Sequence, residues 1–413
     1  MPRVQRVELP SGIKKARWAA AILLMLFGIC ALVYAFVSLL SANSGWNEIK
    51  ANSTDGPNSA SDFVLLYNLG ASGISASAEN RRLTAIYTDA AERAYQLFTG
   101  DLGYQGVHNV YYLNQHVNEE IEVDTALYRV FEQIALSGDR TLYLAPVYEA
   151  YDSLFSCADA AQAAAFDPYQ SETLRAYFAE VAAYARDEDA IALELLGNNR
   201  VCLRVSEAYQ AFVEAEEIKR LIDFSWMRNA FIADYLADVL IENGYRLGTL
   251  SSYDGFVRNL DDVSGAEYAF NLYSRQGGTV YPAAVMRYTG AQSIVSLRSY
   301  PLNSLDFQHY YTFADGQIRT AYLDVRDGLC RSAVDELVAT SVKLGCAEAL
   351  LRLIPLYIAE DWDEARLAAL AADGLYGVYA QGAQLRYTDP ELTLTDLYSG
   401  EAVQFSAAQI PAM

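Results

Sequence analysis

Residues 332–344 bring a carboxylate and a hydroxyl together at a spacing that could hold a metal ion. Ser332 is a good N-cap residue, and Asp335 favours the positive end of a helix, so the pattern predicts a helix that starts here. Glu336 and Thr340 are four residues apart and would share one face of that helix. Their oxygens could ligate a hard cation such as Mg²⁺. The alternative is a capped, solvated helix start, because a carboxylate four residues before Ser or Thr is common.

A second set of polar residues lies closer to the N-terminus. Asp223 and Asp234 enclose a run that leads into a predicted helix ending before Gly244. His309, one of three histidines, precedes the hairpin expected around Asp315-Gly316. It could act as a general base or orient a phosphate group. The alternatives are an N-cap role for Asp223, a solvated helix position for Asp234 and a structural histidine on a strand edge.

The composition excludes one class of partner and indicates an exported domain. The chain has 413 residues and a net charge of −22, which argues against nucleic-acid binding. Residues 1–17 are a basic tail, and residues 18–40 contain no charged side chain over a length that crosses a bilayer as a helix. The basic flank predicts a single-pass anchor with a cytoplasmic N-terminus and the following domain outside the membrane. A cleaved signal peptide is the alternative.

Changes in composition give the boundaries of the folded domain. Residues 41–61 are rich in Ser, Asn and Gly and predict a linker, residues 62–390 form the folded domain, and residues 391–413 are a C-terminal tail. Four cysteines follow the apolar segment, and an even number in an exported domain permits two disulfides in any of three pairings. These are Cys157, Cys202, Cys330 and Cys346. Free thiols are the alternative.

Helical and extended patterns occur in mixed runs along the domain. Apolar spacing predicts helices over residues 80–99, 124–136, 171–185, 222–243, 332–344, 347–357 and 362–372. Short strands or hairpins are expected near residues 61–77, 190–205, 245–260, 310–323 and 374–387, with a strand or loop at 107–114. Mixed runs without strict alternation predict the α+β fold class.

The order and spacing of these segments over Ser61–Tyr387 resemble the FAD:protein FMN transferases of the ApbE type. Asp223–Asp234 is similar to the family's Asp-Leu-Gly-Gly-Ile-Ala-Lys-Gly-Tyr-Ala-Ala-Asp, with both Asp residues at the same separation. The segment Gln308–Tyr311 is similar to the family's His-Ile-Ile-Asp-Pro, with His309 kept and Asp-Pro missing. The resemblance implies an ApbE-type flavin transferase fold behind the predicted anchor.

The same resemblance includes the segment around Thr340. The family's metal-binding helix reads Ala-Asp-Ala-Leu-Ala-Thr-Ala, and aligning its Thr on Thr340 puts the metal-binding Asp at Glu336. A shift of one residue would put that Asp at Asp335 instead. The resemblance therefore implies Glu336 and Thr340 as metal ligands.

The chain departs from the family at positions close to the ligand. Ser225 and Trp226 replace two glycines, and Asn229 replaces a lysine that could meet the diphosphate of FAD. A turn similar to the family's Gly-Gly-Asp keeps Gly255. The cofactor-binding positions that the resemblance implies are Asp223, Asn229, Asp234, Asp254 and Gly255.

The implied activity is transfer of FMN from the donor FAD to a Ser or Thr hydroxyl of an exported acceptor flavoprotein, with Mg²⁺ assistance and His309 as the catalytic base. Attack on the diphosphate requires charge neutralisation at phosphorus and alignment of the nucleophile. The altered glycines and lysine favour a different hypothesis, an inactive relative that binds a flavin, a nucleotide or a protein partner. A structural domain without a ligand is the third hypothesis.

Overall fold

The structure, a computed structural model, describes residues 43–53, 56–302, 306 and 309–411. No helix within these ranges has the length and apolarity needed to cross a membrane. The predicted basic tail at residues 1–17 and the predicted anchor at residues 18–40 lie outside them. The chain divides into two units, residues 1–47 with 68–82 and residues 48–67 with 83–413, which are described separately.

The elements have the following bounds. The helices are α2 (Ala76–Phe98), α3 (Val110–Gln115), α4 (Thr125–Ser137), α5 (Ala145–Phe155), α6 (Ala160–Ala163), α7 (Glu172–Arg186), α8 (Glu207–Ala215), α9 (Arg228–Glu242), α10 (Cys346–Tyr357) and α11 (Glu364–Leu370). The strands are β1 (Gly45–Ile49), β2 (Phe63–Leu69), β3 (Glu120–Glu122), β4 (Ile191–Gly197), β5 (Arg200–Val205), β6 (Gly248–Ser252), β7 (Phe256–Asn259), β8 (Glu267–Gln276), β9 (Thr279–Thr289), β10 (Gln292–Arg298), β11 (Tyr310–Thr312), β12 (Ile318–Thr320), β13 (Glu336–Ser341), β14 (Tyr376–Gln381), β15 (Gln384–Tyr387), β16 (Thr393–Thr395) and β17 (Ser406–Gln409).

In the smaller unit, the turn after β2 is held by a buried carboxylate. Glu79, in the first turn of α2, accepts a hydrogen bond of 2.6 Å from the amide of Gly70 and one of 2.7 Å from the hydroxyl of Ser72. This pair of bonds ties residues 70–72 to the start of the helix.

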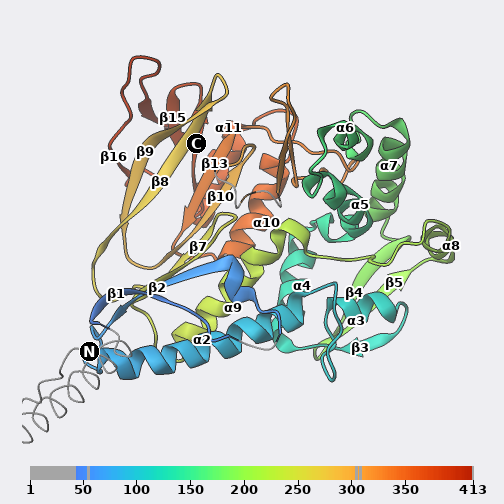
Figure 1. Ribbon diagram of the computed structural model, residues 1–413, viewed down its shortest axis with the longest axis horizontal. Helices are drawn as coiled ribbons and strands as arrows, with labels where there is room; N and C mark the ends of the chain where they lie inside the picture. Colours follow the sequence, from blue (N-terminus) through green and yellow to red (C-terminus); the bar gives the residue numbers. More distant parts are fainter. Residues whose placement is uncertain (1–42, 54–55, 303–305, 307–308, 412–413) are drawn as a thin grey trace, which may run out of the picture. The chain divides into compact units, whose positions relative to one another are not determined.

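One large sheet organises the larger unit (Figure 1). Its strands lie in the order β2-β6-β7-β10-β13-β14-β15-β17, and neighbouring strands are antiparallel except β15 and β17. Helix α9 packs against β6 and β7, and α10 packs against β7, β10 and β13. Separate strands and helices in one unit confirm the α+β class.

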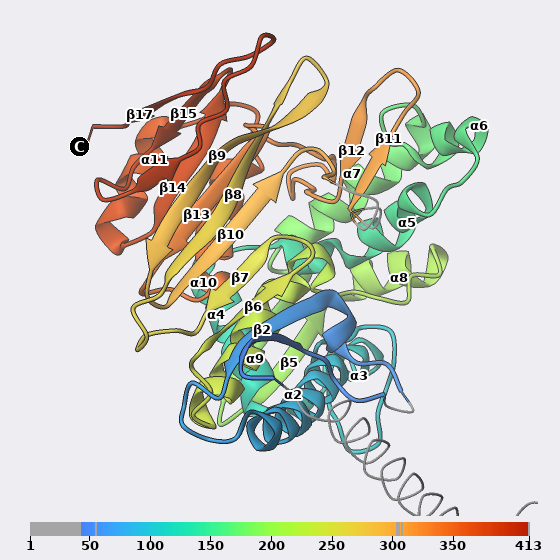
Figure 2. The same cartoon turned by 60° about the vertical axis from the view of Figure 1, so that its left-hand side comes forward.

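A second layer of strands, in the order β16-β9-β8, lies against the main sheet. Figure 2 shows β8 and β9 as a long hairpin across strands β10 and β13. Leu272 and Met286 from this hairpin pack on Val257, Ile294 and Val338 of the main sheet in one buried cluster. The main sheet is therefore covered by helices and by this hairpin layer, so its central strands are apolar on both faces.

The predicted helix over residues 332–344 is wrong. Residues Glu336–Ser341 form β13, which pairs with β10 and β14, and all six residues are buried. Val338 packs towards the hairpin layer, and the alternate residues Leu337 and Ala339 point to the opposite face. A central strand that is buried on both faces lacks the alternation of polar and apolar residues that distinguishes a strand from a helix. Without that alternation, the N-cap signal of Ser332 led to the incorrect prediction of a helix.

Most other elements follow the prediction. The helices expected at residues 80–99, 124–136, 171–185 and 347–357 are confirmed as α2, α4, α7 and α10. The expected strand or loop at 107–114 contains helix α3 instead, whose N-cap Asn109 accepts a bond from the amide of Tyr112. Strand β1 lies within the predicted linker, and β16 and β17 lie within the predicted tail, so the folded domain extends past residue 390.

Candidate functional site

A hollow of about 330 Å³ brings two of the predicted site residues, Asp223 and His309, into one wall. This volume is at the small end of the range for ligand sites, roughly 300–1,000 Å³. We refer to it as the site hollow. Its lining comprises Asp101, Tyr148, Asp152, Phe155, Ser156, Arg220, Asp223, Ser225, Trp226, Arg228, His309 and Ala321.

Asp223 lies in the turn before the helical segment Ser225–Met227 that leads into α9, and it lines the site hollow. Its Oδ1 accepts a hydrogen bond of 2.6 Å from the amide of Ser225, which adopts a left-handed φ of 48°. Its Oδ2 lies so close to Gly100 that a side chain at residue 100 would collide with it. Burial raises the pKa of Asp223, although the Ser225 bond and Arg220 oppose the rise. Asp223 is not an N-cap, because Phe224 and Met227 hold the N-cap positions of the two helical segments that follow. Its carboxyl stabilises the turn before them and lines the hollow.

Trp226 narrows the site hollow without filling it. The side chain is 5 % exposed, and its indole N–H donates a 3.0 Å hydrogen bond to the hydroxyl of Tyr148. The ring meets Tyr322 edge-on, with centroids 4.8 Å apart. These contacts fix the indole as part of the wall, at a position where the resembled pattern has glycine.

His309 lies against a short polar chain. Its Nε2 is 3.8 Å from Oδ2 of Asp254, and that oxygen accepts a 2.9 Å hydrogen bond from the side-chain amide of Asn229. The backbone of His309 donates to the carbonyl of Asp306 and accepts from the amide of Ala321, each at 3.0 Å. Burial lowers the pKa of His309 although Asp254 opposes this, so the imidazole is neutral near pH 7 and can accept a proton.

Two buried oxygens beside this chain are available to a ligand or to water. Oδ1 of Asp254 and Oδ1 of Asn229 have no hydrogen-bond partner within the described residues. Arg228 starts α9 nearby and lies 3.7 Å from Asp62, whose pKa is raised by burial. Buried polar atoms are nearly always hydrogen-bonded, so these two oxygens could accept a bond from water or from a bound ligand. Asn229 and Asp254, both predicted as cofactor-binding, are thus brought together with His309.

Carboxyl groups outnumber cations around Arg220, another residue that lines the hollow. Arg220 lies 2.9 Å from Asp101, 3.7 Å from Glu149 and 4.0 Å from Asp152. Burial raises the pKa of Asp152 to about 6, and Arg220 opposes the rise. Sequence reasoning missed these residues. Arg220 and Arg228 could have been found because they flank Asp223, whereas no local pattern singles out Asp152.

Two predicted cofactor-binding residues have structural roles instead. Gly255 has a φ of 108°, and a side chain there would collide with the backbone oxygen of Ser296, so glycine permits close packing of the turn on β10. Asp234 accepts hydrogen bonds from the amides of Cys346 (2.8 Å) and Ala347 (2.9 Å) and pairs with Arg258. It therefore caps α10 and does not line the site hollow. The alternative interpretation of Asp234 as a solvated helix residue is also wrong, because its carboxylate is bound by two amides and a guanidinium.

The predicted metal pair, Glu336 and Thr340, does not fit a shared ion. On β13 the two residues share one face but are separated by about 13 Å, at roughly 3.3 Å per residue. Glu336 is 3 % exposed and accepts a 2.7 Å hydrogen bond from Tyr300. Thr340 lines a different hollow, together with Tyr376 and Asp389. The alternative ligand Asp335 accepts a 2.8 Å hydrogen bond from the hydroxyl of Ser299. It directly precedes strand β13, so the helix that the metal assignment required is absent there too.

The resembled metal pattern can also be aligned with α10, the helix that follows β13. There, Ala-Asp-Ala-Leu-Ala-Thr corresponds to residues 347–352, with Glu348 in place of the carboxylate and Arg352 in place of the hydroxyl. These two side chains form an ion pair of 2.7 Å. A guanidinium occupies the position of a metal ligand, and no group of three or more acidic, His or Cys side chains in the described ranges could hold a metal ion.

A pH-dependent stability is expected from Glu336. Burial raises its pKa to about 8, although the Tyr300 bond opposes this. The unfolded chain then binds fewer protons than the folded chain between pH 4.5 and 8, so the stabilisation present at low pH is lost as pH rises through that interval. We expect Glu336→Gln to be more stable than the original chain by about 4 kcal/mol at pH 8 and by less than about 1 kcal/mol at pH 5. Urea unfolding at both pH values measures this, and Asp335→Asn is the control that should follow the original chain.

The four cysteines of the folded domain are free thiols. Cys202 and Cys346 are buried, and Cys157 and Cys330 are partly buried. The free-thiol alternative describes this structure, and none of the three disulfide pairings is present.

Comparison with known proteins identifies the fold. No protein-family model and no curated protein matches the sequence. The ApbE protein of Thermotoga maritima is 13 % identical, with a TM-score of 0.54 over 81 % of this chain and 94 % of its own. The flavin transferase ApbE of Vibrio cholerae is 13 % identical, with a TM-score of 0.53 over 85 % of this chain and 97 % of its own. A mutant of the Vibrio protein is 12 % identical, with a TM-score of 0.51 over 86 % of this chain and 97 % of its own.

These similarities extend over most of each chain, and they confirm the expected fold. The chain has the fold of the ApbE flavin transferases. At sequence identities of 12–13 %, a shared fold does not establish a shared activity, so the activity is inferred from the residues of the site hollow.

Proposed function

We propose that this chain transfers FMN from FAD to a Ser or Thr hydroxyl of a protein acceptor. The carrying observation is a neutral imidazole, His309, that lines a hollow with Asp223 and Arg228 in a flavin transferase fold. A neutral imidazole is the group that can take the proton of an attacking hydroxyl near pH 7.

The proposed reaction requires an attack on phosphorus, a base that takes the hydroxyl proton and a positive charge beside the diphosphate. The acceptor oxygen attacks the FMN-side phosphorus of FAD, the new P–O bond forms, the bond from that phosphorus to the bridging oxygen breaks, and AMP leaves. His309 accepts the hydroxyl proton, and the Asp254 carboxylate, 3.8 Å from Nε2, stabilises the resulting imidazolium. Arg228 at the start of α9 offsets negative charge on the diphosphate.

Mg²⁺ assistance remains an expectation from the resemblance. When bound, Mg²⁺ would neutralise charge at phosphorus. Glu336 and Thr340 do not fit a shared ion, so no step of this proposal depends on the metal. The assay below is therefore run with Mg²⁺ and with a chelator.

The proposed setting follows from the N-terminal sequence. Residues 18–40 would anchor the chain in the cell membrane, with residues 1–17 in the cytoplasm and the folded domain outside. The acceptor would then be an exported flavoprotein. Proteolysis of intact cells, with loss of the folded domain but not of the basic tail, tests this arrangement.

A second candidate function is favoured by Trp226. Its indole occupies space that glycine leaves open in the resembled pattern, so the site could bind a flavin or nucleotide without transferring it. In that case FAD would bind reversibly, and no covalent flavin would form.

Covalent transfer separates the two candidates. The full chain in detergent is incubated with FAD and a small FMN-acceptor domain, and denaturing gels are read for flavin fluorescence. We expect a fluorescent acceptor band. Reversible FAD binding without a band would support the second candidate, and absence of both would contradict the two proposals.

A further inference from the structure

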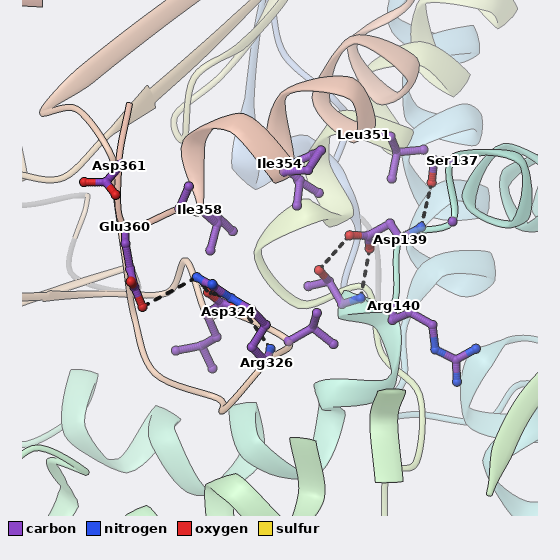
Figure 3. A pocket seen from close by; sticks show the side chains of 16 residues that line it. Ser137, Asp139, Arg140, Asp324, Arg326, Leu351, Ile354, Ile358, Glu360 and Asp361 are labelled. Carbon is purple, nitrogen blue, oxygen red and sulfur yellow. Dashed lines mark hydrogen bonds and ion pairs between the residues drawn. The ribbon is translucent and has the colours of Figure 1, made fainter. Parts of the chain in front are cut away.

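A groove of about 490 Å³ is formed by elements other than those that carry His309 and Asp223 (Figure 3). We call it the α4–α10 groove. Residues 137–141 after α4, residues 323–326 after β12 and the C-terminal half of α10 with residues 358–361 line it. Leu351, Ile354 and Ile358 provide an apolar floor from the α10 side. Such a floor with polar groups at its margin is typical of a recognition surface.

Part of the charge around the groove is internally balanced. Asp324 accepts hydrogen bonds of 2.6 Å from Arg326 and 3.0 Å from Arg331. Glu360 lies 3.9 Å and 3.7 Å from the same two arginines. Arg331 also pairs with Asp327 at 2.6 Å, so three carboxylates share two guanidiniums and this cluster has a net charge of about −1.

Two further carboxyl groups have no ion pair among the described side chains. Within the described residues, Asp139 accepts hydrogen bonds from the amide and hydroxyl of Thr141, at 2.9 Å and 3.0 Å. Arg140 also lines the groove, and it opposes the rise that burial causes in the pKa of Asp139. Its guanidinium, however, donates to the carbonyls of Ala185 and Ile191, each at 2.7 Å. Asp361, on the other side of the floor, is exposed and has no ion pair among the described side chains. A negative group therefore borders the apolar floor on each side.

The apolar surface continues past the edge of the groove. Leu136 precedes the lining residue Ser137 and is 89 % exposed, and Pro355 is exposed on α10. Exposed aliphatic groups beside an apolar floor enlarge the apolar surface that a bound protein segment could bury. Ala321 lines the site hollow and Leu323 lines this groove, so a partner bound here would lie a short segment of chain from the site.

We propose that the α4–α10 groove docks a protein partner through a segment in which an aliphatic side chain lies between lysine or arginine residues. The aliphatic group would occupy the floor over Ile354 and Ile358, and the two cations would meet Asp139 and Asp361. Each cation would gain a carboxylate that lacks one in the free protein. This inference goes beyond flavin transfer and does not depend on it.

The pH dependence of docking follows from Asp139. Burial raises the pKa of Asp139, although its bonds to Thr141 oppose the rise. The carboxyl is therefore protonated at a higher pH than an ordinary Asp, and a cationic partner loses its charge partner as the pH falls. We expect affinity to decrease on acidification.

Fluorescence anisotropy tests the proposal with a short fluorescein-labelled peptide of alternating lysine and leucine, added to the full chain in detergent. A lysine–serine peptide controls for charge alone. We expect the lysine–leucine peptide to bind about tenfold more tightly than the control peptide, and Asp139→Asn with Asp361→Asn to weaken it about tenfold. Leu136→Ser, a change at an exposed position, should weaken it several-fold without affecting folding.

A matched variant tests whether the effect belongs to the groove. Glu207→Gln with Glu214→Gln removes the same charge from the exposed face of α8. This variant should bind the lysine–leucine peptide as the original chain does. Two outcomes would overturn the proposal: equal weakening of binding in both double variants, or equal affinity for the two peptides. Either would show that the peptide is attracted by the overall net charge of −22 and not by the groove.

Discussion

Replacing His309 by alanine is expected to reduce the rate of covalent FMN transfer by about 10²- to 10⁴-fold, because proton transfer by a positioned side chain contributes that much. The fold should persist, since the hydrogen bonds of His309 to Asp306 and Ala321 involve only its backbone. The time course of acceptor fluorescence at saturating FAD measures the rate. Circular dichroism confirms folding.

The control for this result is His108→Ala. The His108 ring stacks on Tyr112 and bonds the carbonyl of Glu122, outside the site hollow, so its loss should leave transfer unchanged. Because burial lowers the pKa of His309, the acid limb of the pH–rate profile should lie below pH 6.5. Transfer that survives His309→Ala, or an acid limb above pH 6.5, would remove His309 from the mechanism.

Replacing Asp234 by alanine is expected to lower the free energy of unfolding by about 2–3 kcal/mol, because a partly buried ion pair and a helix cap are lost together. The Asp234 carboxylate pairs with Arg258 and also caps α10 through the amides of Cys346 and Ala347. The change leaves a guanidinium without its partner and two helix amides without acceptors. Urea unfolding followed by circular dichroism measures the difference.

Asp238→Ala provides the comparison on the same helix, one turn further along. Asp238 is exposed, so its removal should change stability by less than about 0.5 kcal/mol. Asp234→Asn retains one acceptor oxygen and should fall between the two. If Asp234→Ala were no more destabilising than Asp238→Ala, Asp234 would not hold α10, and its assignment as a ligand-binding residue would be open again.

Elements with local signals could be predicted from the sequence, and elements defined by distant partners could not. Helices α4 and α7 have apolar faces and side-chain caps within their own residues, Asp124 and Ser171. Strand β13 depends on β10 and β14, which lie about 40 residues away on either side, and its buried residues lack alternation. Nothing local to Ser332 shows that both faces of this segment are covered.

The same distinction applies to the site. His309 and Asp223 could be predicted because a resemblance carries their positions, and both line the site hollow. Glu336 could not be placed correctly, since its burial against Tyr300 arises from strand pairing. Asp152 was beyond reach for the same reason: its raised pKa depends on burial and on Arg220 from another part of the chain.

Titration of the full chain with FAD tests most directly whether the site hollow is where the flavin nucleotide binds. Arg228→Gln removes a charge from the lining, and Arg246→Gln removes the same charge from a surface pair with Asp262. We predict that Arg228→Gln weakens FAD binding by about tenfold and that Arg246→Gln leaves it unchanged. Equal affinity in all three proteins would contradict the assignment of this hollow.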